Sequence, residues 1–147
     1  PLTKFIKAGL RVGLGTDSPA ATDATDPILD MRLGMLLQRA VNTRSDFITA
    51  AQMIRLATLG SAEALRLDDQ IGSLEVGKKA DIIAIDLSSS NQAPTHDPNS
   101  AIVHTANQDS VMMTMVGGKI LYDREHEEIG NNRIFSRVEE MRIKLRK

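Results

Sequence analysis

The sequence has 147 residues, the length of one domain of ordinary size. Its 18 basic and 19 acidic side chains give a net charge of −1, which argues against a nucleic-acid-binding protein. The absence of cysteine excludes disulfides and thiolate metal ligands and is typical of a reducing compartment. No apolar run approaches the ~20 residues that cross a bilayer. We therefore expect a cytoplasmic protein that binds neither nucleic acid nor membrane.

The first part of the chain has the pattern of an α/β protein. An amphipathic helix is predicted over residues 1–8, ended by Gly9. Residues 11–16 carry no charge apart from Arg11, and this run predicts a strand that is buried on both faces. Asp26 before Pro27 is the expected start of a helix, which we place over residues 27–41. The helix is indicated by apolar residues that recur at helical spacing: Leu29, Leu33, Leu36, Leu37 and Ala40.

Two shorter helices are predicted next. Thr49 and Gln52 match a capping box, and the helix that they start is expected to stop at Leu59 and Gly60. Ser61 is then expected to cap a last helix over residues 62–67.

From Gly72 onward the pattern changes to short β-rich runs separated by glycines and prolines. Strands are predicted over residues 81–86, 101–105, 110–116 and 119–123, with residues 88–99 as a polar surface loop. Gly117 and Gly118 are a strong hairpin signal between the last two strands. Ile134, Val138, Met141 and Leu145 then predict a C-terminal amphipathic helix. We divide the chain into residues 1–70, 71–130 and 131–147.

Asp17 is the candidate functional residue. It follows the predicted strand 11–16, and the carboxyl ends of parallel strands are where α/β proteins bind ligands. Asp-Ser-Pro is also typical of a turn or a helix cap, so both interpretations stay open. Three further acids nearby are expected to have structural roles: Asp23 in a solvated loop, Asp26 as helix N-cap and Asp30 as an exposed acid of the first turn.

Four motifs resemble the C-terminal part of the metal-dependent amidohydrolase superfamily. They are GLRVGLGTDSP from Gly9, MRLGMLLQ from Met31, ATLGSAEAL from Ala57 and IGSLEVGKKADIIAID from Ile71. The resemblance is strongest to the branch that contains S-adenosylhomocysteine and methylthioadenosine deaminases, guanine deaminase and triazine hydrolases. It covers nearly the whole chain, to about Glu128.

The resemblance implies the end of a (β/α)8 barrel and one share of a small β-sandwich. In that fold residues 11–16 are the last barrel strand, and residues 72–123 supply the C-terminal strands of the sandwich. Asp17 is then a ligand of one divalent metal ion, Zn or Fe, and also the catalytic proton acceptor. Ser18 is then a candidate contact to the substrate ring.

The other metal ligands that the resemblance implies, an H-x-H pair and further histidines, are absent from this sequence. Its three histidines, His96, His104 and His126, have neither H-x-H nor i, i+4 spacing, and we expect them to be structural or exposed.

The resemblance predicts a hydrolase that removes an amino or chloro group from a purine-like or triazine-like ring, inactive as these residues alone. Hydrolysis of a cyclic amide or imidazolone within the same superfamily stays open, as does a non-catalytic assembly chain. We expect a small heterocyclic substrate. We also expect a homo-oligomer, because isolated strand edges and an uncovered barrel strand would leave apolar surface exposed.

Overall fold

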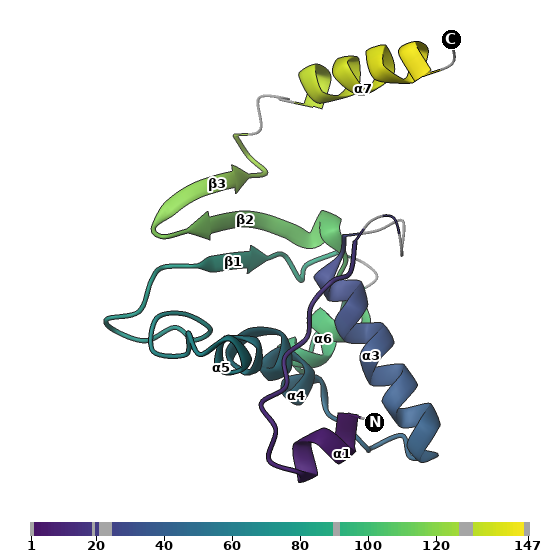
Figure 1. Cartoon of the computed structure of the whole chain (residues 1–147), viewed down its shortest axis with the longest axis vertical. Coiled ribbons are helices and arrows are strands. Elements are labelled where there is room, and N and C mark those ends of the chain that lie inside the picture. The colour runs from purple at the N-terminus through teal and green to yellow at the C-terminus, as the bar shows by residue number, and fades with distance from the viewer. Residues whose placement is uncertain (1, 19, 21–24, 90–91, 127–130, 146–147) are drawn as a thin grey trace.

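The computed structural model describes residues 2–18, 20, 25–89, 92–126 and 131–145 (Figure 1). Most helices gather at one end of the molecule, a small sheet lies beyond them, and the C-terminal helix lies past the sheet (Figure 1). Within the described residues, no helix is both long enough and apolar enough to cross a membrane.

The N-terminal helix α1 (Leu2–Lys7) leads into an extended segment that runs along the helices toward the sheet (Figure 1). The predicted strand over residues 11–16 is wrong for this structure, because no described strand lies beside the segment to complete a ladder. Burial on both faces is also wrong. Val12, Leu14 and Thr16 are half-buried, whereas the residues between them are exposed, so only one side of the segment packs on the helices.

Helix α3 (Pro27–Asn42) begins as predicted. The carboxylate of Asp26 accepts hydrogen bonds from the backbone N–H groups of Ile28 and Leu29, and Pro27 occupies the first turn. The residues that the helix buries are Ile28, Met31 and Met35, not the leucines whose spacing predicted it. The leucine face is exposed by 42–52% at Leu29, Leu33, Leu36 and Leu37. No described element covers that face, so the leucine spacing alone could not select the packed side.

Helix α4 (Ala50–Arg55) has the predicted capping box between Thr49 and Gln52. The predicted stop at Gly60 is wrong, because the backbone continues through a π-helical turn, η1 (Leu56–Gly60), into α5 (Ser61–Leu65). Gly60 keeps helical dihedrals, and a Cβ on it would lie 2.9 Å from the Val12 carbonyl oxygen. This glycine therefore permits close approach of the extended segment and does not end the helix. The left-handed residue Arg66 caps α5, which ends at Leu65, two residues before the predicted end.

The predicted strand over residues 101–105 is wrong, because helix α6 (Pro98–His104) occupies that part of the chain. Asp97 caps its N-terminus by accepting from the N–H groups of Asn99 and Ser100, with Pro98 in the first turn. The predicted surface loop over 88–99 therefore loses its last two residues to α6, and within it Gln92 is buried. Residues 90 and 91 of that loop lie outside the described part.

The core lies between α3, α4 and α6. Its buried members are Ile28, Met31, Met35, Ile48, Ala50, Met53, Val103 and Ala106. Arg32 of α3 donates hydrogen bonds to the carbonyl oxygens of Val103 and Ala106, at the C-terminal end of α6. These two carbonyls belong to fully buried residues, so the guanidinium satisfies acceptors that water cannot reach.

The sheet contains β1 (Ile82–Ile85), β2 (Val111–Val116) and β3 (Lys119–Asp123) in that order, all antiparallel. A short 3₁₀ turn, η2 (Gln108–Ser110), precedes β2. The predicted hairpin is confirmed, since Gly117 and Gly118 both have positive φ, at 56° and 80°. No residue of these three described strands is fully buried, so the sheet leaves apolar surface open.

The predicted C-terminal helix is confirmed as α7 (Asn131–Leu145). Met141, on its predicted apolar face, is 57% exposed. The division of the chain into residues 1–70, 71–130 and 131–147 stays a prediction.

Candidate functional site

The segment that carries Asp17 is held at Leu14 by the α4–η1–α5 rod. The Leu14 N–H lies 3.2 Å from the Leu56 carbonyl oxygen and 3.1 Å from the Ser61 hydroxyl oxygen. That hydroxyl oxygen is in turn 2.9 Å from the carbonyl oxygens of both Leu14 and Leu56. Ser61, predicted to cap a helix, therefore serves as a link between the rod and the segment.

Thr16 makes the second attachment. Its hydroxyl donates to the carboxylate of Asp30 on the first turn of α3, with 2.5 Å between the oxygens. The expectation that Asp30 is an exposed first-turn acid is wrong, since the residue is half-buried and bound to Thr16. The sequence carries no periodic signal for this contact, because it joins an irregular segment to a helix.

Asp17 follows directly and is exposed. One carboxylate oxygen, Oδ1, accepts the backbone N–H of Ser18 at 2.6 Å. This bond joins adjacent residues, and the structure shows no turn at Asp17 or Ser18. A carboxylate has two oxygens and about four acceptor sites, so one such bond leaves capacity for another ligand. The roles of Asp17 as metal ligand and proton acceptor, and of Ser18 as a substrate contact, stay predictions.

The described residues do not form a metal site by themselves. They contain no group of three or more histidine, aspartate or glutamate side chains arranged to hold an ion. Asp17 offers a hard oxygen ligand that suits a divalent cation, but a stable site needs three or four donors. Among the described residues, Asp17 could therefore supply one ligand of such a site and not a complete set.

The three histidines are exposed, as predicted. His126 lies 2.9 Å from the Asp123 carboxylate through Nδ1, and this contact lowers the pKa of Asp123. His104 is in the last turn of α6, and His96 follows Pro94 in the loop before it. None of them points to a catalytic cluster among the described residues.

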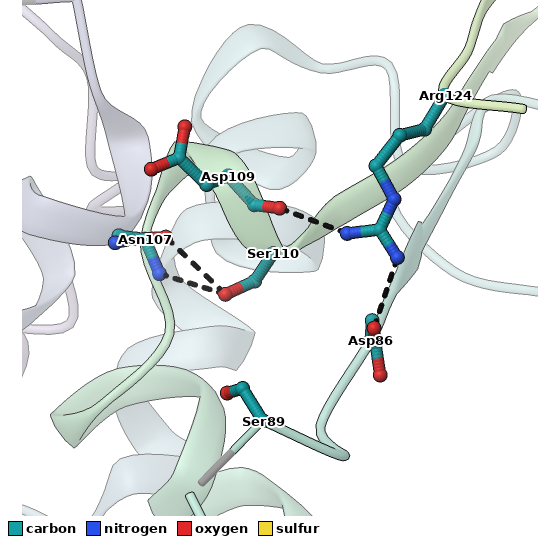
Figure 2. A pocket seen from close by; sticks show the side chains of 6 residues that line it. All are labelled: Asp86, Ser89, Asn107, Asp109, Ser110 and Arg124. Atoms are coloured by element: carbon teal, nitrogen blue, oxygen red, sulfur yellow. Dashed lines mark hydrogen bonds and ion pairs between the residues drawn. The ribbon is translucent and has the colours of Figure 1, made fainter. Parts of the chain in front are cut away.

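A polar pocket of about 180 Å³ lies where β1 and β3 end, beside η2 (Figure 2). Arg124 spans it, donating to the Asp86 carboxylate at 2.9 Å and to the Asp109 carbonyl at 3.0 Å. The pKa of Asp86 is lowered to about 2, chiefly because the Ser88 hydroxyl and N–H donate to it, and further by Arg124. Arg124, just after β3, thus binds Asp86, just after β1, so the lining side chains of this pocket connect the ends of two strands.

The chain is similar to known hydrolases over nearly its whole length. Residues 1–121 match the family described as Amidohydrolase family. A 5-methylthioadenosine/S-adenosylhomocysteine deaminase of Thermoanaerobacter pseudethanolicus is 33% identical over 140 residues, which are 95% of this chain and 32% of that protein. An S-triazine hydrolase of Gordonia rubripertincta is 36% identical over 121 residues, which are 82% of this chain and 25% of that protein.

A solved structure has the same fold over the same region. The adenosine deaminase from Xanthomonas campestris, with bound zinc, superposes with a TM-score of 0.87 and 32% identity. The superposition covers 95% of this chain and 32% of that one. The chain thus spans between a quarter and a third of the length of the relatives that it matches. With residues 1–121 of its 147 matched by one family, the chain belongs to the amidohydrolase family.

Proposed function

We propose that this chain is the C-terminal part of a metal-dependent hydrolase that removes an amino or chloro group from a purine-like or triazine-like ring. One observation carries the proposal: Asp17 follows a segment anchored at Leu14 and Thr16, in a chain similar to deaminases and a triazine hydrolase. Alone, the chain lacks the other metal-binding groups and is expected to be inactive.

The proposed fold makes residues 11–16 the last strand of a (β/α)8 barrel and the sheet β1–β3 one share of a β-sandwich. Two observations support it. The segment has no strand beside it among the described residues, and the leucine face of α3 is exposed. In a barrel, neighbouring strands would pair with residues 11–16, and a neighbouring helix would cover the leucine face of α3.

In the proposed reaction Asp17 acts as ligand and as proton carrier. A divalent ion, Zn or Fe, supplies the Lewis acid that lowers the pKa of a water molecule at such a site. Asp17 would help to hold that ion, would accept a proton from the attacking water and would pass the proton to the departing amine. Ser18, exposed beside Asp17, is proposed to donate a hydrogen bond to a ring nitrogen of the substrate.

The absence of cysteine supports a cytoplasmic location.

The exposed apolar surface favours a second candidate function. The leucine face of α3 and the half-exposed sheet would serve equally well as contacts in a non-catalytic homo-oligomer. Hydrolysis of a cyclic amide or imidazolone ring remains the alternative chemistry at the same aspartate.

The test uses the polypeptide encoded by the complete reading frame that contains this chain. Zinc and iron content would be measured, and release of ammonia or chloride followed with 5-methylthioadenosine, S-adenosylhomocysteine, guanine and a chlorotriazine. Ring opening of a cyclic amide, which releases neither, would be followed by loss of the starting compound. We expect one metal ion per chain and activity on an amino- or chloro-substituted ring. Turnover of the cyclic amide alone would favour the alternative chemistry. If the protein binds no metal and turns over none of these compounds, the result would favour the non-catalytic homo-oligomer.

Asp17→Asn should reduce kcat by about 10³-fold, because the proton acceptor and an anionic metal ligand are both lost, while the melting temperature of the metal-free protein stays unchanged. Asp26→Asn is the matched control, since asparagine caps a helix as well as aspartate does. An Asp17→Asn enzyme with full activity would exclude the proposed role.

A further inference from the structure

We infer that Asp30 is a positioning residue for Asp17, which it orients by holding the hydroxyl of Thr16. The inference rests on the proposed function, because it gives the direction of the Asp17 side chain a purpose. It goes beyond that function by assigning a role to Asp30, a side chain on helix α3 that lies 14 residues after Thr16.

The contact lies at the last described anchor before Asp17. Leu14 is fixed to Leu56 and Ser61, but Gly15 is exposed and a Cβ on it would meet nothing within 4 Å. The chain between Leu14 and Asp17 is therefore held by the side chain of Thr16. The distance of 2.5 Å to Asp30 is in the range of a hydroxyl donating to a carboxylate, the stronger class of hydrogen bond.

The acceptor is carried by a rigid element. Asp30 is in the first turn of α3, where its N–H donates to the Asp26 carbonyl at 3.0 Å. Its neighbour Met31 is buried in the core, as is Ile28 two residues earlier. The packing of α3 therefore fixes the position of the Asp30 carboxylate, and Thr16 is bound to a side chain that does not move independently of the core.

The alternation of the extended segment converts this anchor into a direction for Asp17. Successive side chains of an extended chain point to opposite sides. Thr16 points toward α3 and is half-buried, whereas Asp17 is exposed. Fixing the Thr16 side chain thus fixes which way the next carboxylate faces.

A role confined to helix stability does not explain the contact. An acid in the first turn favours the helix through the charge of the N-terminus alone. The free N–H groups of that turn already have the Asp26 carboxylate as acceptor, at 2.9 Å from Ile28 N and 3.1 Å from Leu29 N. The Asp30 side chain instead leaves the helix and accepts from the segment that carries the functional residue.

The experiment compares Thr16→Val with Thr16→Ser in the polypeptide encoded by the complete reading frame. Valine keeps the shape of threonine and loses the hydroxyl, whereas serine keeps the hydroxyl. Three quantities would be measured: kcat and KM, zinc affinity by competition with a chelator, and amide hydrogen exchange of Ser18 in the metal-free protein. The Ser18 N–H donates to Asp17 Oδ1, so its exchange rate reports the position of that side chain directly.

We expect Thr16→Val to lower kcat or zinc affinity by about 10–100-fold, as loss of a residue behind a metal ligand does, with KM little changed. Exchange of the Ser18 amide should accelerate in the same variant. Thr16→Ser should restore all three quantities. Asp30→Leu should reproduce the effect of Thr16→Val, and the double variant should be no worse than either single one, because both remove one hydrogen bond. Asp30→Leu also serves if Thr16→Val does not fold.

Two results separate the possible failures. If Asp17→Asn is inactive while Thr16→Val and Asp30→Leu lower only the melting temperature, with kcat, zinc affinity and Ser18 exchange unchanged, the contact is merely structural and this inference is wrong. If Asp17→Asn retains full activity, the proposed function is wrong. Accelerated Ser18 exchange in Thr16→Val would then still show that Thr16 fixes the side chain of Asp17.

Discussion

Gly13 and Ser61 approach each other so closely that a Cβ placed on Gly13 would lie 2.5 Å from the Cα atom of Ser61. The neighbouring contact is also close, since a Cβ placed on Gly60 would lie 2.9 Å from the carbonyl oxygen of Val12. Backbone therefore packs on backbone where the extended segment crosses the helical rod. This contact, together with the two hydrogen-bonded anchors, decides how far Asp17 stands from the helices.

Gly13→Ala is expected to destabilise the protein by about 1–3 kcal/mol, the usual cost of forcing an extra methyl group into a packed contact. The obstacle is the backbone of Ser61, which cannot rotate away as a flexible side chain could. Urea unfolding would measure the loss. Gly15→Ala is the matched control, because open space surrounds that position. Equal losses in the two variants would contradict the packing described here.

The elements found correctly from sequence are those specified by neighbouring residues. Asp26 before Pro27, Thr49 with Gln52, and Gly117 with Gly118 each set a cap or a turn through hydrogen bonds within a few residues. These contacts depend on residues that are neighbours in the sequence and not on the packing of distant elements. Their positions could therefore be predicted without knowledge of the fold.

The wrong predictions depend on contacts between distant residues or on a signal that was missed. A strand needs a neighbour, and residues 11–16 have none among the described elements. Gly60 resembles a helix stop until Val12 is placed against it. Asp97 before Pro98 repeats the helix-start signal of Asp26, but β-rich runs on both sides of it favour a strand. At the candidate site, Asp17 could be named from its motif, but Asp30 could not, because only the packing of α3 brings it to Thr16.

Acid titration is expected to show that Ser88, more than Arg124, keeps the Asp86 carboxyl ionised. The pKa of Asp86 is lowered to about 2 in the folded protein, against an ordinary value of 3.8. Its contribution to stability is therefore complete above about pH 4 and is lost as the pH falls toward 2. Carbon NMR of the carboxyl group would follow the titration.

Ser88→Ala should raise the pKa of Asp86, because it removes the hydroxyl hydrogen bond, the largest cause of the low value, while alanine keeps the backbone N–H. Asp86→Asn should flatten the decline of the melting temperature between pH 4 and pH 2. An unchanged pKa of Asp86 in Ser88→Ala would contradict this role of the hydroxyl.

The two sides of α3 provide a direct test of the proposed barrel. Met35 is fully buried in the described structure, whereas the adjacent Leu36 is 50% exposed. In the 147-residue chain, Met35→Ala should cost about 2–5 kcal/mol through the cavity that it leaves. Leu36→Ala should cost less than about 1 kcal/mol, because little apolar surface is lost from the interior.

The comparison is then repeated in the polypeptide encoded by the complete reading frame. If a barrel covers the leucine face, Leu36→Ala should there approach the cost of Met35→Ala, since the same side chain is now buried. A small cost in both settings would contradict the barrel. A large cost already in the 147-residue chain, with a melting temperature that rises with protein concentration, would instead show that copies of the chain cover this face for one another.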